Sequence, residues 1–77
     1  MELEKFIENF AEQFSDTDPN NIKADTIFRD LEEWSSLIAL SVIAMIDEEY
    51  EIILKGEDMR KAITVAELYE IVKNKIK

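Results

Sequence analysis

Apolar residues recur at helical spacing at the start of the chain. Over residues 2–14 they form one stripe, with glutamates on the other faces; the apolar positions are 3, 6, 7, 10, 11 and 14. This pattern predicts a first helix over residues 2–14. A turn-rich connection follows over residues 15–35, in which Asp18-Pro19 and Asp25-Thr26 are expected to begin short helical turns, the second over residues 27–31. Because apolar side chains must hold so long a connection to the core, we expect core contacts from Ile22, Ile27, Phe28, Leu31 and Trp34.

The middle of the chain is apolar at every position over residues 37–46 except Ser41. Such a run is too short to span a bilayer, and it predicts a helix with apolar side chains on most faces that ends near Glu51. We expect this helix to be central in the fold and to contact the other helices on most sides. Ser35 or Ser36 is expected to cap its first turn.

Two shorter patterns complete the fold prediction. Residues 58–62, which follow a break at Gly56, are long enough only for a short helix. Thr64 and Glu67 have the spacing of a capping box, and the last helix follows with apolar residues at positions 65, 68, 69, 72 and 76. Together the patterns predict an all-α fold with a single domain over residues 1–77. It is a small bundle of three main helices and one short helix, with a long loop between the first two main helices.

The composition excludes several kinds of chemistry. The chain has no cysteine and no histidine, which removes disulfides, zinc thiolates, thiol nucleophiles and the usual general base at neutral pH. No loop has the ligand spacing of a dedicated calcium site, so we expect no metal. A chain of 77 residues can form one small core but no enclosed cleft of ordinary enzyme size. We therefore expect no enzymatic activity.

The net charge of -9 is distributed unevenly along the chain. Residues 1–51 contain 14 acidic and 3 basic residues, whereas residues 52–77 contain 4 acidic and 6 basic ones. This distribution argues against binding to nucleic acid or insertion into membranes and favours protein partners with basic patches. The first residues lack the basic start and apolar stretch of a signal peptide, so we expect a cytoplasmic location.

An ordered set of short segments surrounds the predicted central helix. The letters F-R-D-L at residues 28–31, Trp34 and the pair Ser36-Leu37 precede it, and D-E-E-Y at residues 47–50 closes it. In this order and spacing the chain resembles the acyl carrier protein family, whose members have F-x-D-L, often a Trp, then D-S-L and a helix with an acidic-aromatic end. The resemblance extends over most of the chain, including the turn near Pro19 and the helix start at Thr64.

The resemblance implies that the chain carries acyl groups on a covalently attached cofactor. A phosphopantetheinyl transferase would transfer 4′-phosphopantetheine from coenzyme A to the Ser36 hydroxyl, and the thiol of that arm would hold acyl groups as thioesters. The carrier would pass them between acyl-transferring and condensing enzymes of fatty-acid or polyketide-like biosynthesis, and we expect it to act as a monomer. The partner-binding residues implied are Ser35, Leu37, Asp47, Glu48 and Glu49. The acyl pocket implied is formed by Phe28, Ile43, Ile46, Leu54, Ile63 and Leu68.

Two features depart from the family pattern. Ser35 stands where the family has the Asp that helps the transferase and its metal to engage the carrier. A tolerant transferase, replacement of that Asp by Glu33, and loss of the arm are the three outcomes left open. Ile38 and Ser41 occupy positions that are often acidic in fatty-acid carriers, which favours a specialised, free-standing carrier.

Each of these residues also has a purely structural interpretation. Ser36 can be a helix cap, the acidic run can be a solvated face, and the residues of the acyl pocket can be ordinary core. Trp34 can either anchor a partner or close the loop over the core. Two alternatives from other classes are an unmodified acidic helical module that binds a basic protein partner, and a small regulatory helical protein unrelated to carriers.

Overall fold

The computed structural model describes residues 2–76. In that part of the chain the main helices are α1 (Leu3–Ala11), α2 (Ser36–Tyr50) and α4 (Val65–Lys75), and α3 (Gly56–Lys61) is short. Two 3₁₀ turns, η1 (Pro19–Asn21) and η2 (Phe28–Asp30), lie in the connection between α1 and α2. The predicted all-α fold, its three main helices with one short helix and its long first connection are therefore confirmed. Within residues 2–76, β pairing is limited to an isolated bridge between Ile27 and Thr64.

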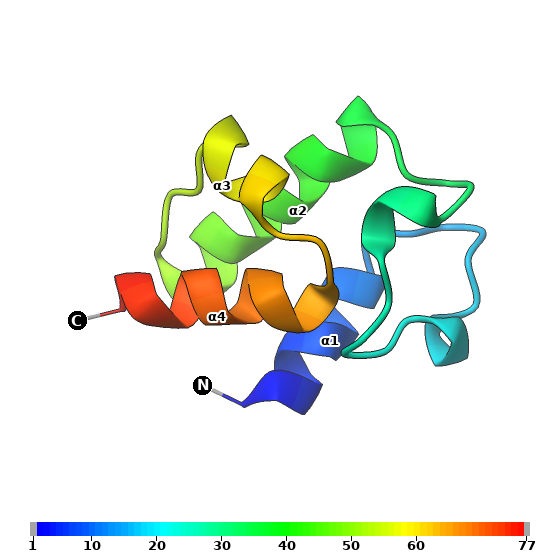
Figure 1. The fold of residues 1–77 in the computed structure, drawn as a ribbon, viewed down its shortest axis with the longest axis horizontal. Helices are drawn as coiled ribbons and strands as arrows, with labels where there is room; N and C mark the ends of the chain where they lie inside the picture. The colour runs from blue at the N-terminus through cyan, green and yellow to red at the C-terminus, as the bar shows by residue number, and fades with distance from the viewer. Residues whose placement is uncertain (1, 77) are drawn as a thin grey trace.

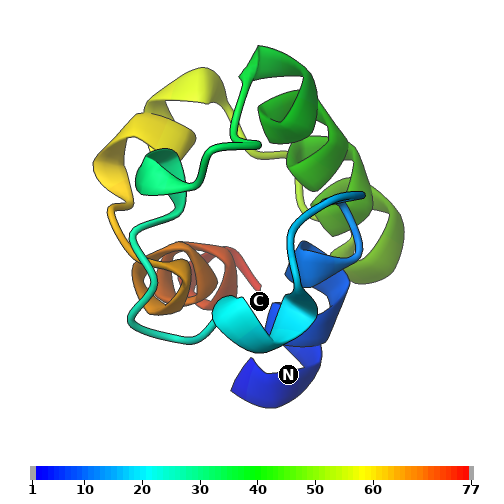
Figure 2. The ribbon, with the colours of Figure 1, turned by 90° about the vertical axis from the view of Figure 1, so that its right-hand side faces the viewer.

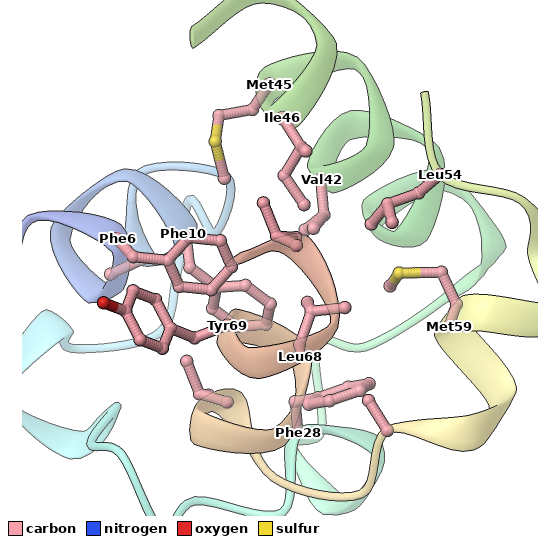
Figure 3. Packing of buried hydrophobic residues seen from close by; sticks show 14 of the residues in the cluster. Phe6, Phe10, Phe28, Val42, Met45, Ile46, Leu54, Met59, Leu68 and Tyr69 are labelled. Atoms are coloured by element: carbon pink, nitrogen blue, oxygen red, sulfur yellow. The ribbon is translucent and has the colours of Figure 1, made fainter. Parts of the chain in front are cut away.

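The helices enclose a single core. Figure 1 shows the long connection on the side of the bundle opposite the two ends of the chain. Seen from that side in Figure 2, the elements surround a central region, and η2 lies next to α3. Core side chains fill this region, as Figure 3 shows; those with no exposed surface include Phe6, Phe10, Phe28, Val42, Ile46 and Leu68.

Aromatic side chains form much of this core. The Phe6 and Tyr69 rings meet edge to face, with their centroids 5.6 Å apart. Beside Phe6, the buried amide of Asn9 donates a hydrogen bond of 3.0 Å to the Tyr50 hydroxyl, which joins α1 to the end of α2. Since a buried amide without a partner is costly, this bond lets a polar residue lie within the core.

The first helix ends earlier than predicted. It stops at Ala11 because the amides of Gln13 and Phe14 donate to the carbonyls of Phe10 and Ala11, three residues back, so the chain tightens out of the α-helix. Phe14 nevertheless stays buried. Four positions of the predicted stripe are buried, and Leu3 and Ile7 are partly buried against the core, so the stripe identified the inward face correctly. The predicted end of the helix was wrong.

The predicted cap of the second short turn was also wrong. Thr26 does not cap η2; its hydroxyl accepts a hydrogen bond from the Lys23 amide. Its carbonyl accepts from the Val65 amide, and the Ala24 carbonyl accepts from the Ala66 amide. These bonds fix the connection to the first turn of α4. The next residue, Ile27, is 44% exposed and is not the core contact that was predicted.

The other predicted core contacts of the connection are confirmed. Ile22 and Phe28 are buried, and Leu31 and Trp34 are partly buried against the core. The turn at Pro19 is also confirmed, because the Asp18 carboxylate accepts a hydrogen bond of 2.9 Å from the Asn20 amide and so caps η1.

The short helix begins at Gly56, two residues before the predicted start at residue 58. The Asp58 carboxylate accepts a hydrogen bond from the amide of Lys55, the N-cap residue directly before Gly56. This bond stabilises the first turn of α3 and places its start at Gly56. This bond lowers the pKa of Asp58, against the opposing effect of burial, and the Lys75 ammonium 3.5 Å away lowers it further. The ion pair ties α3 to the end of α4.

The last helix follows the predicted cap. The Thr64 hydroxyl accepts from the Glu67 amide at 3.1 Å, and the Glu67 carboxylate accepts from the Ile63 amide, one residue ahead of the usual capping-box partner. The predicted stripe is buried at positions 65, 68, 69 and 72. Ile76 was predicted wrongly, because it lies beyond the helix and is 44% exposed.

Candidate functional site

The two serines before α2 have different roles. Ser35 is the N-cap: its backbone is extended, and its hydroxyl accepts a hydrogen bond of 3.3 Å from the Ile38 amide. Ser36 is the first residue of the helix, and its side chain is exposed. Among residues 2–76 its hydroxyl has no hydrogen-bond partner. The Ser36 hydroxyl is thus held at a rigid helix end without being used in the cap.

The start of α2 favours an anion on that hydroxyl. The first amides of a helix have no carbonyl partner within it, and the helix dipole places partial positive charge there. Ser35 uses one of these amides, through Ile38. A phosphate attached to Ser36 would lie beside the other unpaired amides of this first turn.

Glu33 is committed to the loop after α1. Its carboxylate accepts five hydrogen bonds of 2.7–3.0 Å, from the amides of Ser15, Asp16 and Thr17 and the hydroxyls of Ser15 and Thr17. Desolvation raises the pKa of Glu33, but the hydrogen bonds from Thr17, Ser15 and Asp16 together outweigh it and lower the pKa to about 2. Glu33 therefore does not offer a free carboxylate in place of the missing Asp before Ser36.

Trp34 closes the connection over the core. Its ring lies 4.8 Å from the Phe28 ring and stacks on Phe10 and Phe14 at 6.4 and 6.2 Å, measured between centroids. The side chain remains partly exposed and also borders the groove described next. Its main role is thus packing, and it lines the same groove as Ser35 and Ser36.

A groove of about 540 Å³ opens beside the two serines, between α2, α3 and η2. Its apolar lining comes from Trp34 and from one side of α2 and α3. Its polar lining comes from the serines and two arginines. The lining residues are Arg29, Trp34, Ser35, Ser36, Ala39, Leu40, Ile43, Gly56, Met59 and Arg60.

Most of the predicted acyl-pocket residues are packed core. Phe28, Ile46, Leu54 and Leu68 are buried among the helices, as Figure 3 shows. Ile43 is partly buried and is the one member of the predicted set that lines the groove. Ile63, at 49% exposed, lies before α4 and outside the groove.

The predicted partner-binding residues are exposed on α2 or directly before it. Leu37 is 72% exposed near the start of the helix, and Asp47, Glu48 and Glu49 are exposed near its end. Ser35 precedes the helix and is also exposed. The structure therefore leaves all five accessible, at opposite ends of one helix.

Two residues on the outer side of α2 were missed because the central helix was expected to be buried on most sides. Leu40 is 63% exposed and Ala44 is exposed as well, whereas only Val42, Met45 and Ile46 of α2 are buried. Positions 37, 40, 44, 47 and 48 follow helical spacing on one face. The continuation of this spacing into acidic residues was the signal in the sequence for an exposed face.

Arg29 was also missed. Its Nη2 donates to the carbonyls of Met59, Arg60 and Ala62 at 2.6–2.7 Å, so its guanidinium binds the C-terminal end of α3. It also lies 5.5 Å from the centre of the Phe28 ring. A single arginine in a loop carries no sequence signal for such a role.

Comparison with known proteins assigns neither a family nor a function to this chain. No helix within residues 2–76 has the length and apolar character needed to cross a membrane. The acidic side chains of the same residues form no group of three that could hold a metal ion. The chain matches no protein-family model, no curated protein and no solved structure.

Proposed function

We propose that this protein is an acyl carrier that bears 4′-phosphopantetheine on Ser36. The observation that carries the proposal is the separation of the two serines: Ser35 caps α2, and the exposed Ser36 hydroxyl has no partner among residues 2–76. A residue that is merely a cap would use its own hydroxyl in the cap. The arm would supply the thiol that this chain, without cysteine, lacks.

The chemistry asked of the chain is small. A phosphopantetheinyl transferase joins the Ser36 oxygen to the phosphorus next to pantetheine. The phosphoanhydride bond of coenzyme A breaks, adenosine 3′,5′-bisphosphate leaves, and the hydroxyl proton passes to the transferase. Ser36 contributes an accessible oxygen at a fixed position. The arm then carries an acyl group as a thioester, which separate enzymes form and consume.

The outer side of α2 supports the delivery step. Its apolar start, with Leu37 and Leu40, and its acidic end, with Asp47 and Glu48, suit a partner that has an apolar spot next to basic residues. Complementary charge speeds encounter more than it tightens binding, which fits a carrier that must leave each enzyme quickly.

One alternative has a specific observation in its favour. Ser35 replaces the usual Asp, and Glu33 is engaged elsewhere, so the part of the family pattern that recruits the transferase is missing. The outer side of α2 would still serve an unmodified module that binds a basic protein partner.

Intact-mass measurement separates the two. The protein is incubated with coenzyme A and a broad-range phosphopantetheinyl transferase, and the carrier proposal predicts the gain of one phosphopantetheine. Ser36→Ala abolishes the gain, whereas Ser35→Ala, the matched control, retains it. No gain with any transferase tested refutes the carrier proposal and favours the interaction module.

A further inference from the structure

The groove beside Ser36 holds both arginines of the chain. The nine basic residues comprise seven lysines and the two arginines Arg29 and Arg60, and no lysine within residues 2–76 lines the groove. A guanidinium presents a planar fork of N–H groups that fits the oxygens of a phosphate, whereas an ammonium acts as a point charge. The residue type that suits phosphate recognition therefore lines a groove that also includes Ser36.

Neither arginine of the groove forms an ion pair with an acid of residues 2–76. No acidic residue in the described part of the chain lines the groove, although the sequence has twice as many acidic as basic residues. The ion pairs present within residues 2–76 join Lys5 to Glu8 and Lys75 to Asp58, and neither involves an arginine. A positive groove in an acidic protein favours an anionic ligand.

Both guanidinium groups have donors to spare. Arg29 binds the carbonyls of α3 through Nη2 alone, so its Nε and Nη1 groups have no partner among residues 2–76. Arg60 reaches back across the first turn of α3, where its Nη1 would lie 3.8 Å from a Cβ at Gly56. The glycine leaves this side of the groove open to the guanidinium.

The rest of the lining suits the carbon chain of such a ligand. Leu40 and Ile43 of α2, Met59 of α3 and Trp34 supply apolar surface. The groove volume of about 540 Å³ is within the range of small-molecule sites, roughly 300–1,000 Å³.

We propose that this groove binds an organic phosphate, the phosphate end of the pantetheine arm, with Arg60 and Arg29 as counter-ions and the carbon chain on the apolar lining. The identity of the ligand rests on the proposed modification of Ser36. In this resting position the arm lies between α2 and α3 instead of moving freely in water, and partners must draw it out.

Non-covalent binding to Ser36→Ala protein tests the groove without any modification step. The replaced hydroxyl has no partner among residues 2–76, so the variant keeps the fold, which circular dichroism verifies. The probes are 4′-phosphopantetheine, pantetheine without phosphate, and inorganic phosphate. Binding is followed through the NMR signals of the Gly56 amide and the arginine Nε–H groups, and through Trp34 fluorescence.

The expected result is saturable binding of 4′-phosphopantetheine, with pantetheine and inorganic phosphate each at least about fivefold weaker, because each lacks one half of the contacts. Adding Arg60→Gln to the Ser36→Ala protein should weaken the binding of 4′-phosphopantetheine by a similar factor. This substitution keeps the backbone carbonyl of residue 60, to which Arg29 donates. Lys61→Gln, its exposed neighbour outside the groove, leaves binding unchanged.

Three results would overturn the inference: no saturable binding, equal binding of pantetheine and 4′-phosphopantetheine, or equal weakening by Arg60→Gln and Lys61→Gln. None of them depends on whether a transferase modifies Ser36. A chain that is modified on Ser36 but does not bind the free arm would thus remain a carrier with a freely moving arm. A chain that binds the free arm but is never modified would refute only the carrier proposal.

Discussion

Arg29 holds α3, and with it one wall of the groove, in place. Arg29→Met removes the guanidinium and keeps an unbranched apolar stem. Nη2 has two hydrogens for its three carbonyl partners on Met59, Arg60 and Ala62, so two full hydrogen bonds are the most it contributes. At about 1 kcal/mol for each bond, and with a few tenths for charge at a helix C-terminus, we expect Arg29→Met to destabilise the fold by about 2 kcal/mol.

Urea unfolding measures this loss. The chain contains a single tryptophan, Trp34, which packs beside η2 and reports on unfolding by fluorescence. With a dependence of about 1 kcal/mol per molar urea for a small protein, the midpoint falls by about 2 M. A chain of this size has a total stability of about 4–12 kcal/mol, so the variant still folds. Arg29→Lys retains the charge but not the fork, and we expect about half of the loss.

Lys61→Met is the matched control. It removes a positive charge from the last turn of the same helix, but Lys61 donates no hydrogen bond to the carbonyls at the end of α3. Exposed substitutions of this kind usually change stability by less than about 0.5 kcal/mol. Equal midpoints for Arg29→Met and Lys61→Met would refute this role for Arg29. So would hydrogen exchange that speeds up in α1 as much as in α3.

Four further predictions concern individual residues. Because the folded-state pKa of Glu33 is lowered from 4.5 to about 2, its hydrogen bonds stabilise the fold fully above pH 4.5 and progressively less as the pH falls toward 2. Glu33→Gln should therefore make the melting temperature depend less on pH between 4.5 and 2, and the same pH dependence in variant and wild type would contradict this. Glu51 ends α2 in the left-handed region, at φ 56°, so Glu51→Gly should raise the free energy of unfolding by about 1 kcal/mol and Glu51→Val should lower it. Gly56→Ala should raise the free energy of unfolding by about 0.5–1 kcal/mol, because the glycine has negative φ and the nearest atom to an added Cβ, on Arg60, is 3.8 Å away. A urea midpoint below that of the wild type would contradict this and show that the added methyl group does not fit. Ser35→Asp keeps a good N-cap and introduces the Asp that acyl carriers have before the modified Ser. If the proposed function holds, loading by a transferase should become faster at unchanged stability, and slower loading would contradict it.

The helices were predictable because each repeats its apolar positions over several turns. Their ends were not, because single hydrogen bonds decide them. The hydrogen bond to the Asp58 carboxylate lets α3 begin two residues earlier in the sequence than predicted. The hydrogen bonds that the amides of Gln13 and Phe14 donate end α1 three residues earlier than predicted. The prediction for the central helix failed for another reason: an apolar run shows that a helix forms but not how many of its faces have a neighbour. Leu40 and Ala44, which are exposed, therefore looked like core.

The candidate site was predictable in part. A pair of serines before an apolar helix indicated both a cap and an exposed hydroxyl, but only the hydrogen bond to Ile38 distinguishes Ser35 from Ser36. Apolar residues that line a groove have no pattern that separates them from core, which is why Ile43 alone of the predicted pocket borders the groove. Arg29 and Arg60 are 31 residues apart in the chain and meet only through tertiary packing.

The proposal that Ser36 carries the arm is tested most directly by locating the modification. After incubation with coenzyme A and a phosphopantetheinyl transferase, the tryptic peptide of residues 30–55 contains three serines, at positions 35, 36 and 41. Fragmentation of this peptide by mass spectrometry should place one phosphopantetheine on Ser36. An unmodified peptide, or an arm on Ser35 or Ser41, would contradict the proposal.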